Sequence, residues 1–451
     1  MARFLVLAPL LAFALAYVPD MGHGFVKDDF RWISESRVEG VADALALFVR
    51  DNGFYRPLVG LSFAADHALF GVRPFPYAVT NLLVILAAAA ALHALARALG
   101  LSPGAAAFAA AAFLLNPHGI KDAILWISGR TSGLLTLLSL LAALAFARGR
   151  VWWSAGAVLF ALFCKEEAVL LPAILAAGAA VRAPGGLPHR VRLALLSSWP
   201  LFLPLPLYFA LRSMTGAYLP GTAPPHYQPS LDPGLVARNV FEYTDRACIV
   251  PLLALGLIAL LARRRPRVDP GERGVLLWGL LWIAGGYGLT VWLPVRSSLY
   301  AVLPSAGAAL AGAVLAQALW REAAPGPRTK LLVAAALVPL LLVPVYRDRN
   351  RRAVSEAELS TAVLDDLARA FADNHPKATF VLEDDPDAQP NLERSFGTLL
   401  EFAVFLRTGR VRSVRYSPAG ATWTVAEIAP YRPTGGRTVL VLSGGRLQER
   451  E

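Results

Sequence analysis

Residues 77–96 read YAVTNLLVILAAAAALHALA and contain no Asp, Glu, Lys or Arg. A helix of about 20 such residues reaches across the hydrocarbon core of a bilayer. Similar apolar stretches recur along the 451-residue chain, which is 56% hydrophobic and 17% charged. Because soluble domains carry about a quarter charged residues, this composition predicts a polytopic α-helical membrane protein. It excludes a soluble domain, and its hydrophobicity excludes a disordered chain.

We predict about eleven transmembrane helices, at residues 3–19, 77–96, 101–115, 131–147, 151–164, 167–181, 193–211, 247–262, 274–293, 298–319 and 331–346. The first stretch also has features of a signal peptide, namely Arg3, an apolar run and the small-residue pattern at Ala14 and Ala16. Removal of that segment would leave ten spans.

Basic residues mark one side of the predicted membrane part. They fall in alternate loops, at Arg97, Arg148, Arg150, Arg182, Arg190, Arg192, Arg263, Arg264, Arg265, Arg267, Arg273, Arg321, Arg328 and Lys330. Loops rich in Lys and Arg face the cytoplasm, so we expect a cytoplasmic N-terminus. The net charge of +11 then reflects topology, and we expect no nucleic-acid partner.

The opposite, extracytoplasmic loops hold the candidate catalytic residues. The first of them, residues 20–76, contains the neighbouring carboxylates Asp28 and Asp29. Adjacent carboxylates repel each other, which raises the pKa of one of them and suits proton abstraction. The alternative is a solvated acid pair or a helix cap near Phe30. Asp43, Asp51 and Asp66 have no comparable context, and we expect them at the surface.

Three cations in these loops are candidates for binding a donor phosphate. Arg56 lies in FYRPL before a proline that restrains the backbone, and Lys165 lies in CKEE beside Glu166 and Glu167. Arg296 is a lone cation in the short loop PVRSS. The alternatives are arginines that extend to lipid headgroups and, for Lys165, an internal ion pair.

The second outer loop, NPHGIKDAILWISGR at 116–130, supplies candidate substrate-pocket residues. These are His118, Asp122 and Arg130, together with Glu166 of the third loop. If residues 120–130 form one short helix, Asp122 and Arg130 share a face. Ordinary polarity next to the membrane is the alternative. Cys164 and Cys248 fall near outer helix ends; helix packing is the favoured interpretation, and a disulfide is the alternative.

The composition changes after about residue 347, where charged residues become frequent. Segments 352–373 and 395–407 show helical spacing, and Thr379–Leu382 and Thr438–Leu442 resemble strands. We therefore predict a transmembrane domain at 1–346 and a small α/β extracytoplasmic domain at 347–451. The sequence contains no zinc-binding spacing, P-loop or GxSxG motif.

Five segments, taken in order, resemble the GT-C glycosyltransferases. They are KDDF (27–30), FYRPL (54–58), NPHGIKDAILWISGR (116–130), CKEEAVLLP (164–172) and RSSLYAVLPSAG (296–307). The nearest likeness is the protein O-mannosyltransferase-like branch, which includes the transmembrane-and-TPR O-mannosyltransferases and their bacterial relatives. The resemblance covers roughly residues 1–320. No TPR array follows, and Ser132 replaces an acid often found after the GR of the second loop.

The resemblance implies a GT-C-like fold and an extracytoplasmic reaction with a polyprenyl-phosphate sugar. It makes Asp28 the catalytic base and Asp29 its neighbour, and it matches Arg56 and the Lys165-Glu166 pair to family motifs. Asp122 matches less well, because its motif is one residue longer than usual before the tryptophan. Some GT-C enzymes use a divalent ion at the acidic pair, and the sequence leaves this open.

Together these features predict an inverting glycosyltransferase of a bacterial inner membrane. Its partners would be the lipid-linked sugar donor, membrane lipids and a protein or glycolipid acceptor. The alternatives are a transporter or flippase for a polyprenyl-linked glycan, which would bind phosphate with the same cations but need no base, and a non-catalytic assembly partner.

Overall fold

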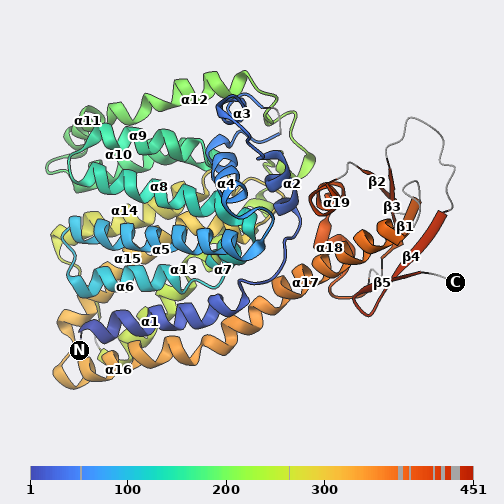
Figure 1. Ribbon diagram of the computed structural model, residues 1–451. Helices are drawn as coiled ribbons and strands as arrows, with labels where there is room; N and C mark the ends of the chain where they lie inside the picture. The colour runs from blue at the N-terminus through green and yellow to red at the C-terminus, as the bar shows by residue number, and fades with distance from the viewer. Residues whose placement is uncertain are drawn as a thin grey trace.

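The computed structural model describes residues 2–50, 53–263, 265–373, 379–384, 387–409, 412–417, 422–427 and 437–449. Long helices lie roughly side by side in a bundle, and a β-sheet lies beyond one end of it (Figure 1). The two parts are joined by α17, which runs out of the bundle and reaches the sheet.

Each of the eleven predicted spans overlaps a helix of the bundle. These helices are α1 Ala2–Tyr17, α5 Pro74–Ala98, α6 Pro103–Leu114, α8 Arg130–Ala147, α9 Val151–Leu162, α10 Leu171–Arg182, α11 Leu187–Ser198, α12 Pro204–Ser213, α13 Pro233–Ala262, α14 Pro270–Tyr287, α15 Val302–Glu322 and α16 Pro325–Leu341. The predicted span 193–211 covers both α11 and α12, which are joined by the 3-10 helix Trp199–Phe202.

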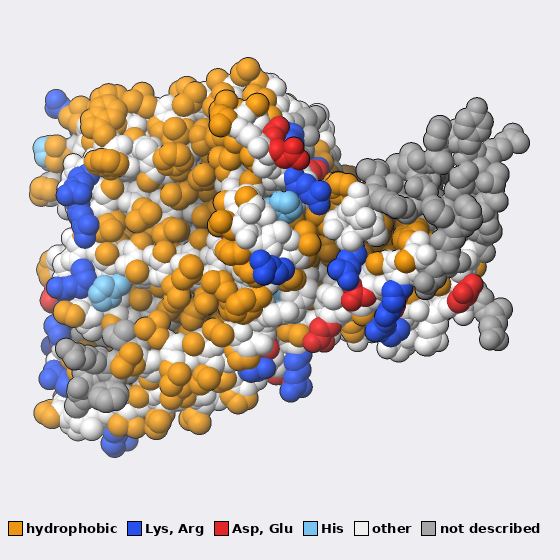
Figure 2. All heavy atoms as spheres, viewed as in Figure 1, with side chains coloured by type: hydrophobic (Ala, Val, Ile, Leu, Met, Phe, Trp, Pro, Cys, Tyr) orange, Lys and Arg blue, Asp and Glu red, His pale blue; other side chains and the backbone are white. Residues whose placement is uncertain are grey.

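Six stretches in the described part of the chain are long and apolar enough to cross a membrane. They are Pro74–Ala98, Ile127–Ala147, Leu187–Ser213, Pro233–Ala262, Ser298–Glu322 and Pro325–Ala372. Other expected spans form shorter helices, so the count of eleven is only partly matched. Hydrophobic side chains cover much of the bundle surface; Lys and Arg lie at the end away from the sheet with few acidic residues, whereas the end facing the sheet carries both charge signs (Figure 2). The chain is a multi-pass membrane protein.

Helix α15 lies at the centre of the bundle and is buried along most of its length. Its small residues allow a close approach to α14. A Cβ atom on Gly279 of α14 would lie 2.8 Å from the carbonyl oxygen of Gly307, and one on Gly307 would lie 2.7 Å from that of Gly279. Small residues at such interfaces let membrane helices pack backbone to backbone.

Short helices cover the end of the bundle that faces the sheet: α2 Asp28–Glu35, α3 Val41–Ala46, α4 Pro57–Phe70 and α7 Gly119–Leu125. Helix α4 lies inside the predicted outer loop 20–76, where no span was expected. It is apolar but only 14 residues long, and Asp66 and His67 interrupt its apolar run. This end of the bundle holds the candidate site.

The tail folds into what we call the C-terminal unit, formed by α17 Val343–Asp373, α18 Leu392–Phe396, α19 Leu400–Thr408 and five strands. The strands are β1 Thr379–Glu383, β2 Arg412–Ser417, β3 Thr422–Glu427, β4 Arg437–Ser443 and β5 Arg446–Glu449. Their order is β2-β3-β1-β4-β5, with β1 and β4 parallel and the other pairs antiparallel. The expected domain boundary at residue 347 falls inside α17.

Candidate active site

Asp28 is the first residue of α2 and is exposed to solvent. Within the described chain it makes no hydrogen bond or ion pair. Partial removal from water raises the pKa of its carboxyl group, and the nearby cations Arg56, Arg31 and Lys27 oppose that rise. Asp28 is thus an open carboxylate with cations around it.

Asp29 has the opposite environment, because its side chain is fully buried. Its Oδ1 accepts hydrogen bonds from the backbone N–H of Ser128 at 2.7 Å and from the Ser128 hydroxyl at 2.5 Å. Its Oδ2 accepts one from the Val26 N–H at 3.0 Å. Burial raises the pKa of Asp29 to about 7, although these hydrogen bonds favour the ionised form. Asp29 therefore ties the start of α2 to the second outer loop.

The loop segment that bears Ser128 depends on a close backbone contact at Gly129. A Cβ atom at that position would lie 2.2 Å from the carbonyl oxygen of Asp122, a distance that real side chains do not adopt. The 3-10 turn Ile127–Gly129 therefore folds directly against α7. The sequence analysis missed Ser128, although it lies within the WISGR motif that was quoted.

Arg56 lies immediately before α4 and pairs with Glu166, a residue 110 positions later. Its Nε and Nη2 donate to the two carboxylate oxygens of Glu166 at 3.0 and 2.7 Å. The guanidinium also lies 4.3 Å from the centre of the Phe54 ring. Because Glu166 occupies one edge of the guanidinium, the N–H groups on Nη1 are left for another anion.

Lys165 lies one residue before Glu166 and is 4% exposed. Its Nζ lies 2.7 Å from Glu167 Oε1, donates to the Ser132 hydroxyl at 3.0 Å, and lies 4.8 Å from the centre of the Tyr300 ring. Ser132, which replaces the acid expected from the family pattern, thus serves as a neutral partner for the lysine. An ammonium group has three N–H donors, and Glu167 and Ser132 accept two of those of Lys165.

Tyrosines surround these ion pairs, and the sequence analysis assigned them no role. Tyr227 packs edge-on against Phe54 at 5.4 Å. Burial raises the pKa of the Tyr227 hydroxyl, Asp28 adds to this rise, and Arg56 opposes it. Tyr227 and Arg56 both pack on the Phe54 ring, and Asp28 is within electrostatic reach of both residues. Tyr227 lies in the segment between α12 and α13, and the aromatic residues of that segment were the available signal.

Arg296 has a carboxylate partner of its own, and the convergence of Arg56, Lys165 and Arg296 on one phosphate stays a prediction. Its Nη1 lies 2.5 Å from Glu242 of α13, and the same carboxylate also binds Arg238 and Arg246. This charged cluster satisfies the arginine locally.

Arg130 is buried in the protein and is not exposed to a substrate pocket. Its Nη2 lies 2.5 Å from Asp66 Oδ2, and its Nε donates to Asn81 Oδ1 at 2.7 Å. The guanidinium lies 4.4 Å from the centre of the Phe63 ring. The expectation that Asp66 is a surface residue was wrong, because the residue is 5% exposed and serves as the buried counter-ion. Asp51 lies outside the described residues.

The interpretation of residues 120–130 as one helix was also wrong. Helix α7 ends at Leu125, and Trp126 has an extended backbone before the 3-10 turn. Asp122 pairs with Lys121 at 3.2 Å, and His118 Nδ1 lies 3.3 Å from Arg349 of α17. His118 thus contacts α17, whereas Asp122 pairs with its sequence neighbour in α7.

The structure also bears on the alternatives of a disulfide and of a metal site. Cys164 and Cys248 are both free, so no disulfide joins them. In the described part of the chain, no group of three or more His, Cys, Asp or Glu side chains is arranged to bind a metal ion.

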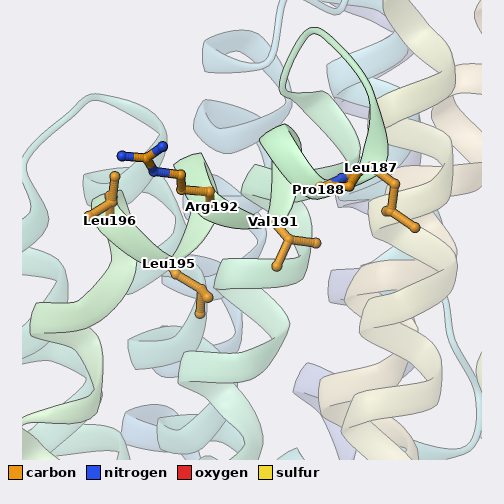
Figure 3. Close-up of a pocket in the computed structure, with 6 residues that line it drawn as sticks. All are labelled: Leu187, Pro188, Val191, Arg192, Leu195 and Leu196. Atoms are coloured by element: carbon orange, nitrogen blue, oxygen red, sulfur yellow. The ribbon is translucent and has the colours of Figure 1, made fainter.

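A large open hollow of about 650 Å³ lies on α11 (Figure 3), lined by Leu187, Pro188, Val191, Arg192, Leu195 and Leu196. Its lining is almost entirely apolar, with Arg192 as the charged residue, and it holds no carboxylate that could act as a base.

Comparison with known proteins yields a structural relative. No family model matches the chain, and no curated protein matches it. The crystal structure of ArnT from Cupriavidus metallidurans bound to undecaprenyl phosphate superposes with a TM-score of 0.51 at 18% sequence identity, covering 82% of this chain and 72% of the ArnT chain. At this identity the likeness concerns the fold alone. It supports the polytopic helical fold expected from the sequence and does not distinguish the O-mannosyltransferase-like branch.

Proposed function

We propose that this protein is a membrane glycosyltransferase that moves a sugar from a polyprenyl-phosphate donor to an acceptor hydroxyl. The observation that carries this proposal is the open carboxylate of Asp28 within electrostatic reach of Arg56, at one end of an ArnT-like helix bundle. The neighbour's bound undecaprenyl phosphate supports a lipid-phosphate donor of the same class.

In this proposal Asp28 accepts the proton of the acceptor hydroxyl as its oxygen attacks C1 of the sugar. The bond from C1 to the phosphate oxygen breaks on the opposite face, so the configuration at C1 inverts. The negative charge on the departing polyprenyl phosphate is stabilised by the free edge of Arg56 and by Lys165. Glu166 and Glu167 hold the two cations in place, and Asp29 holds the start of α2.

The revised site uses two of the three cations expected from the sequence. Arg296 binds Glu242, so we assign it to the structure of the outer loops. We place the site on the extracytoplasmic side of a bacterial inner membrane, because the end of the bundle away from it carries the Lys- and Arg-rich loops (Figure 2). The acceptor is a protein or a glycolipid.

The test is a transfer assay with purified full-length protein in liposomes that contain a radiolabelled polyprenyl-phosphate sugar. A membrane extract supplies protein and glycolipid acceptors. The proposal predicts label in the acceptor fraction and release of polyprenyl phosphate. Movement of intact donor across sealed vesicles, with no transfer, would instead identify a flippase.

A further inference from the structure

Two parts of the C-terminal unit hold residues 24–30, which we call the acidic turn because it carries Asp28 and Asp29. The first part is α17. The Ser360 hydroxyl lies 2.5 Å from the carbonyl oxygen of Phe25, and it shares its one hydrogen between this oxygen and that of Ala357, in its own helix, at 2.9 Å. Glu356, one turn earlier, lies 3.2 Å from the Nζ of Lys27. Both α17 side chains are buried, whereas the Lys27 side chain is 37% exposed.

The second part is α18, which contacts the other end of the acidic turn. The backbone N–H of Lys27 donates to the carbonyl oxygen of Ser395 at 2.9 Å. The rings of Phe30 and Phe396 stack with centres 5.7 Å apart, and both are buried. Thus one residue before Asp28 and one residue after Asp29 are each in contact with α18.

The backbone of the acidic turn is adapted to this contact. A Cβ atom on Gly24 would lie 2.1 Å from the Thr361 hydroxyl and 2.7 Å from the carbonyl oxygen of Ala357, so the turn lies directly on α17. Lys27 has a φ of +49°, a conformation that costs free energy for a residue with a side chain. Such a conformation persists only where surrounding contacts determine it, and here those contacts come from α17 and α18.

We propose that the C-terminal unit sets the position of Asp28, with Ser360, Glu356 and Phe396 as positioning residues. The catalytic consequence rests on the proposed function. A carboxylate that must meet an acceptor hydroxyl loses rate steeply when it is misplaced, by about 10²-fold for a shift of 1 Å. The unit therefore completes the active site through the backbone of the acidic turn.

The test uses Ser360→Ala, which removes one hydroxyl with little change of shape, in the full-length purified protein. The matched control is Ser355→Ala on the same helix, where the hydroxyl bonds only to Arg352 of its own helix. Hydrogen exchange of peptides that cover residues 23–30 reports the order of the turn. Sugar transfer reports its effect, with kcat and the donor KM measured separately across pH.

We expect faster exchange of residues 23–30 in Ser360→Ala, with kcat lower by about three- to thirtyfold. The donor KM and the pH at which the rate falls should stay as in wild type, because no charge near the donor changes. Ser355→Ala should match wild type in every readout. Glu356→Gln, which removes the ion pair with Lys27, should repeat the loss of kcat.

Unchanged exchange in both Ser360→Ala and Glu356→Gln would overturn the proposal, and so would faster exchange with unchanged kcat. A loss confined to donor KM would also overturn it, because that pattern indicates general damage to the donor site. If wild type transfers no sugar at all, the proposed function fails, and the exchange result still decides whether the C-terminal unit orders the acidic turn.

Discussion

Ser128 gives two hydrogen bonds to one oxygen of Asp29, from its backbone N–H at 2.7 Å and from its hydroxyl at 2.5 Å, although the two residues are 99 positions apart. Both residues are buried. This contact joins the first outer loop, which carries Asp28, to the second. It explains why two adjacent carboxylates have different environments: one is fixed inside the protein, and the other is exposed.

We expect Ser128→Ala to lower the free energy of unfolding by about 1–3 kcal/mol, because the change removes a buried donor to a carboxylate. Ser197→Ala is a suitable control, since that hydroxyl bonds only to Ala194 of its own helix. Thermal unfolding in detergent measures both variants. Equal stability of the two variants would show that the Ser128 hydroxyl contributes nothing to the fold.

The stability of the protein should depend on pH through Asp29. The pKa of Asp29 is raised to about 7, whereas an unfolded Asp titrates near 3.9. Between these values the folded state holds a proton that the unfolded state has lost, so stability falls as pH rises from about 4 to about 7. We predict a smaller decrease in Asp29→Asn over this range, measured as Tm against pH. An identical slope in wild type and variant would contradict this assignment.

The sequence identified most of the helices because long apolar runs are local signals. The same runs did not reveal α4, whose 14 residues are too few for a confident span and include Asp66. The start of α13 was also missed. It begins at Pro233 rather than near 247, after Asp232, whose side chain caps Gly234, and its first turns are too polar to count as membrane.

The candidate site could be predicted only where its residues lie close together in the sequence. The pair Asp28-Asp29 and the segment CKEE at 164–167 are local motifs that can be recognised from the sequence. The partners of Arg56 and Arg130 are 110 and 64 positions away, so only the folded chain reveals them. Arg130 and Arg296 illustrate the limit, because an arginine in such a loop has the same sequence context whether it binds substrate or a carboxylate of the protein itself.

Breaking the buried Arg130–Asp66 pair should be strongly destabilising. Arg130→Met removes the arginine that pairs with Asp66, while Asp66 itself stays buried. Such a loss costs about 3–5 kcal/mol in the free energy of unfolding. Arg238→Met, on an arginine whose side chain is 63% exposed and which binds Glu242, should cost about 1 kcal/mol or less. The measurement is the yield of folded protein and its Tm in detergent. Similar losses in both variants would place Arg130 outside the core of the fold.

The two-cation site predicts different outcomes for Arg56 and Arg296. Arg56→Lys should weaken donor binding about tenfold or more, because a point charge cannot bind Glu166 and a phosphate with a planar fork. Arg296→Lys should leave donor affinity within about threefold of wild type, since Arg296 binds Glu242. Titration of purified protein with a polyprenyl-phosphate sugar measures both. Equal losses of donor affinity in the two variants would show that Arg296 also binds the donor phosphate, as the three-cation arrangement requires.

Single-turnover transfer by Asp28→Asn tests the central claim most directly. Removal of a general base typically lowers the rate about 10²–10⁴-fold. We predict a loss of that size with Tm and donor affinity close to wild type, because Asp28 is exposed and makes no hydrogen bond within the described chain. Asp29→Asn should act first on stability. Transfer at the wild-type rate by Asp28→Asn, from a folded protein that binds donor, would show that this carboxylate is not the base.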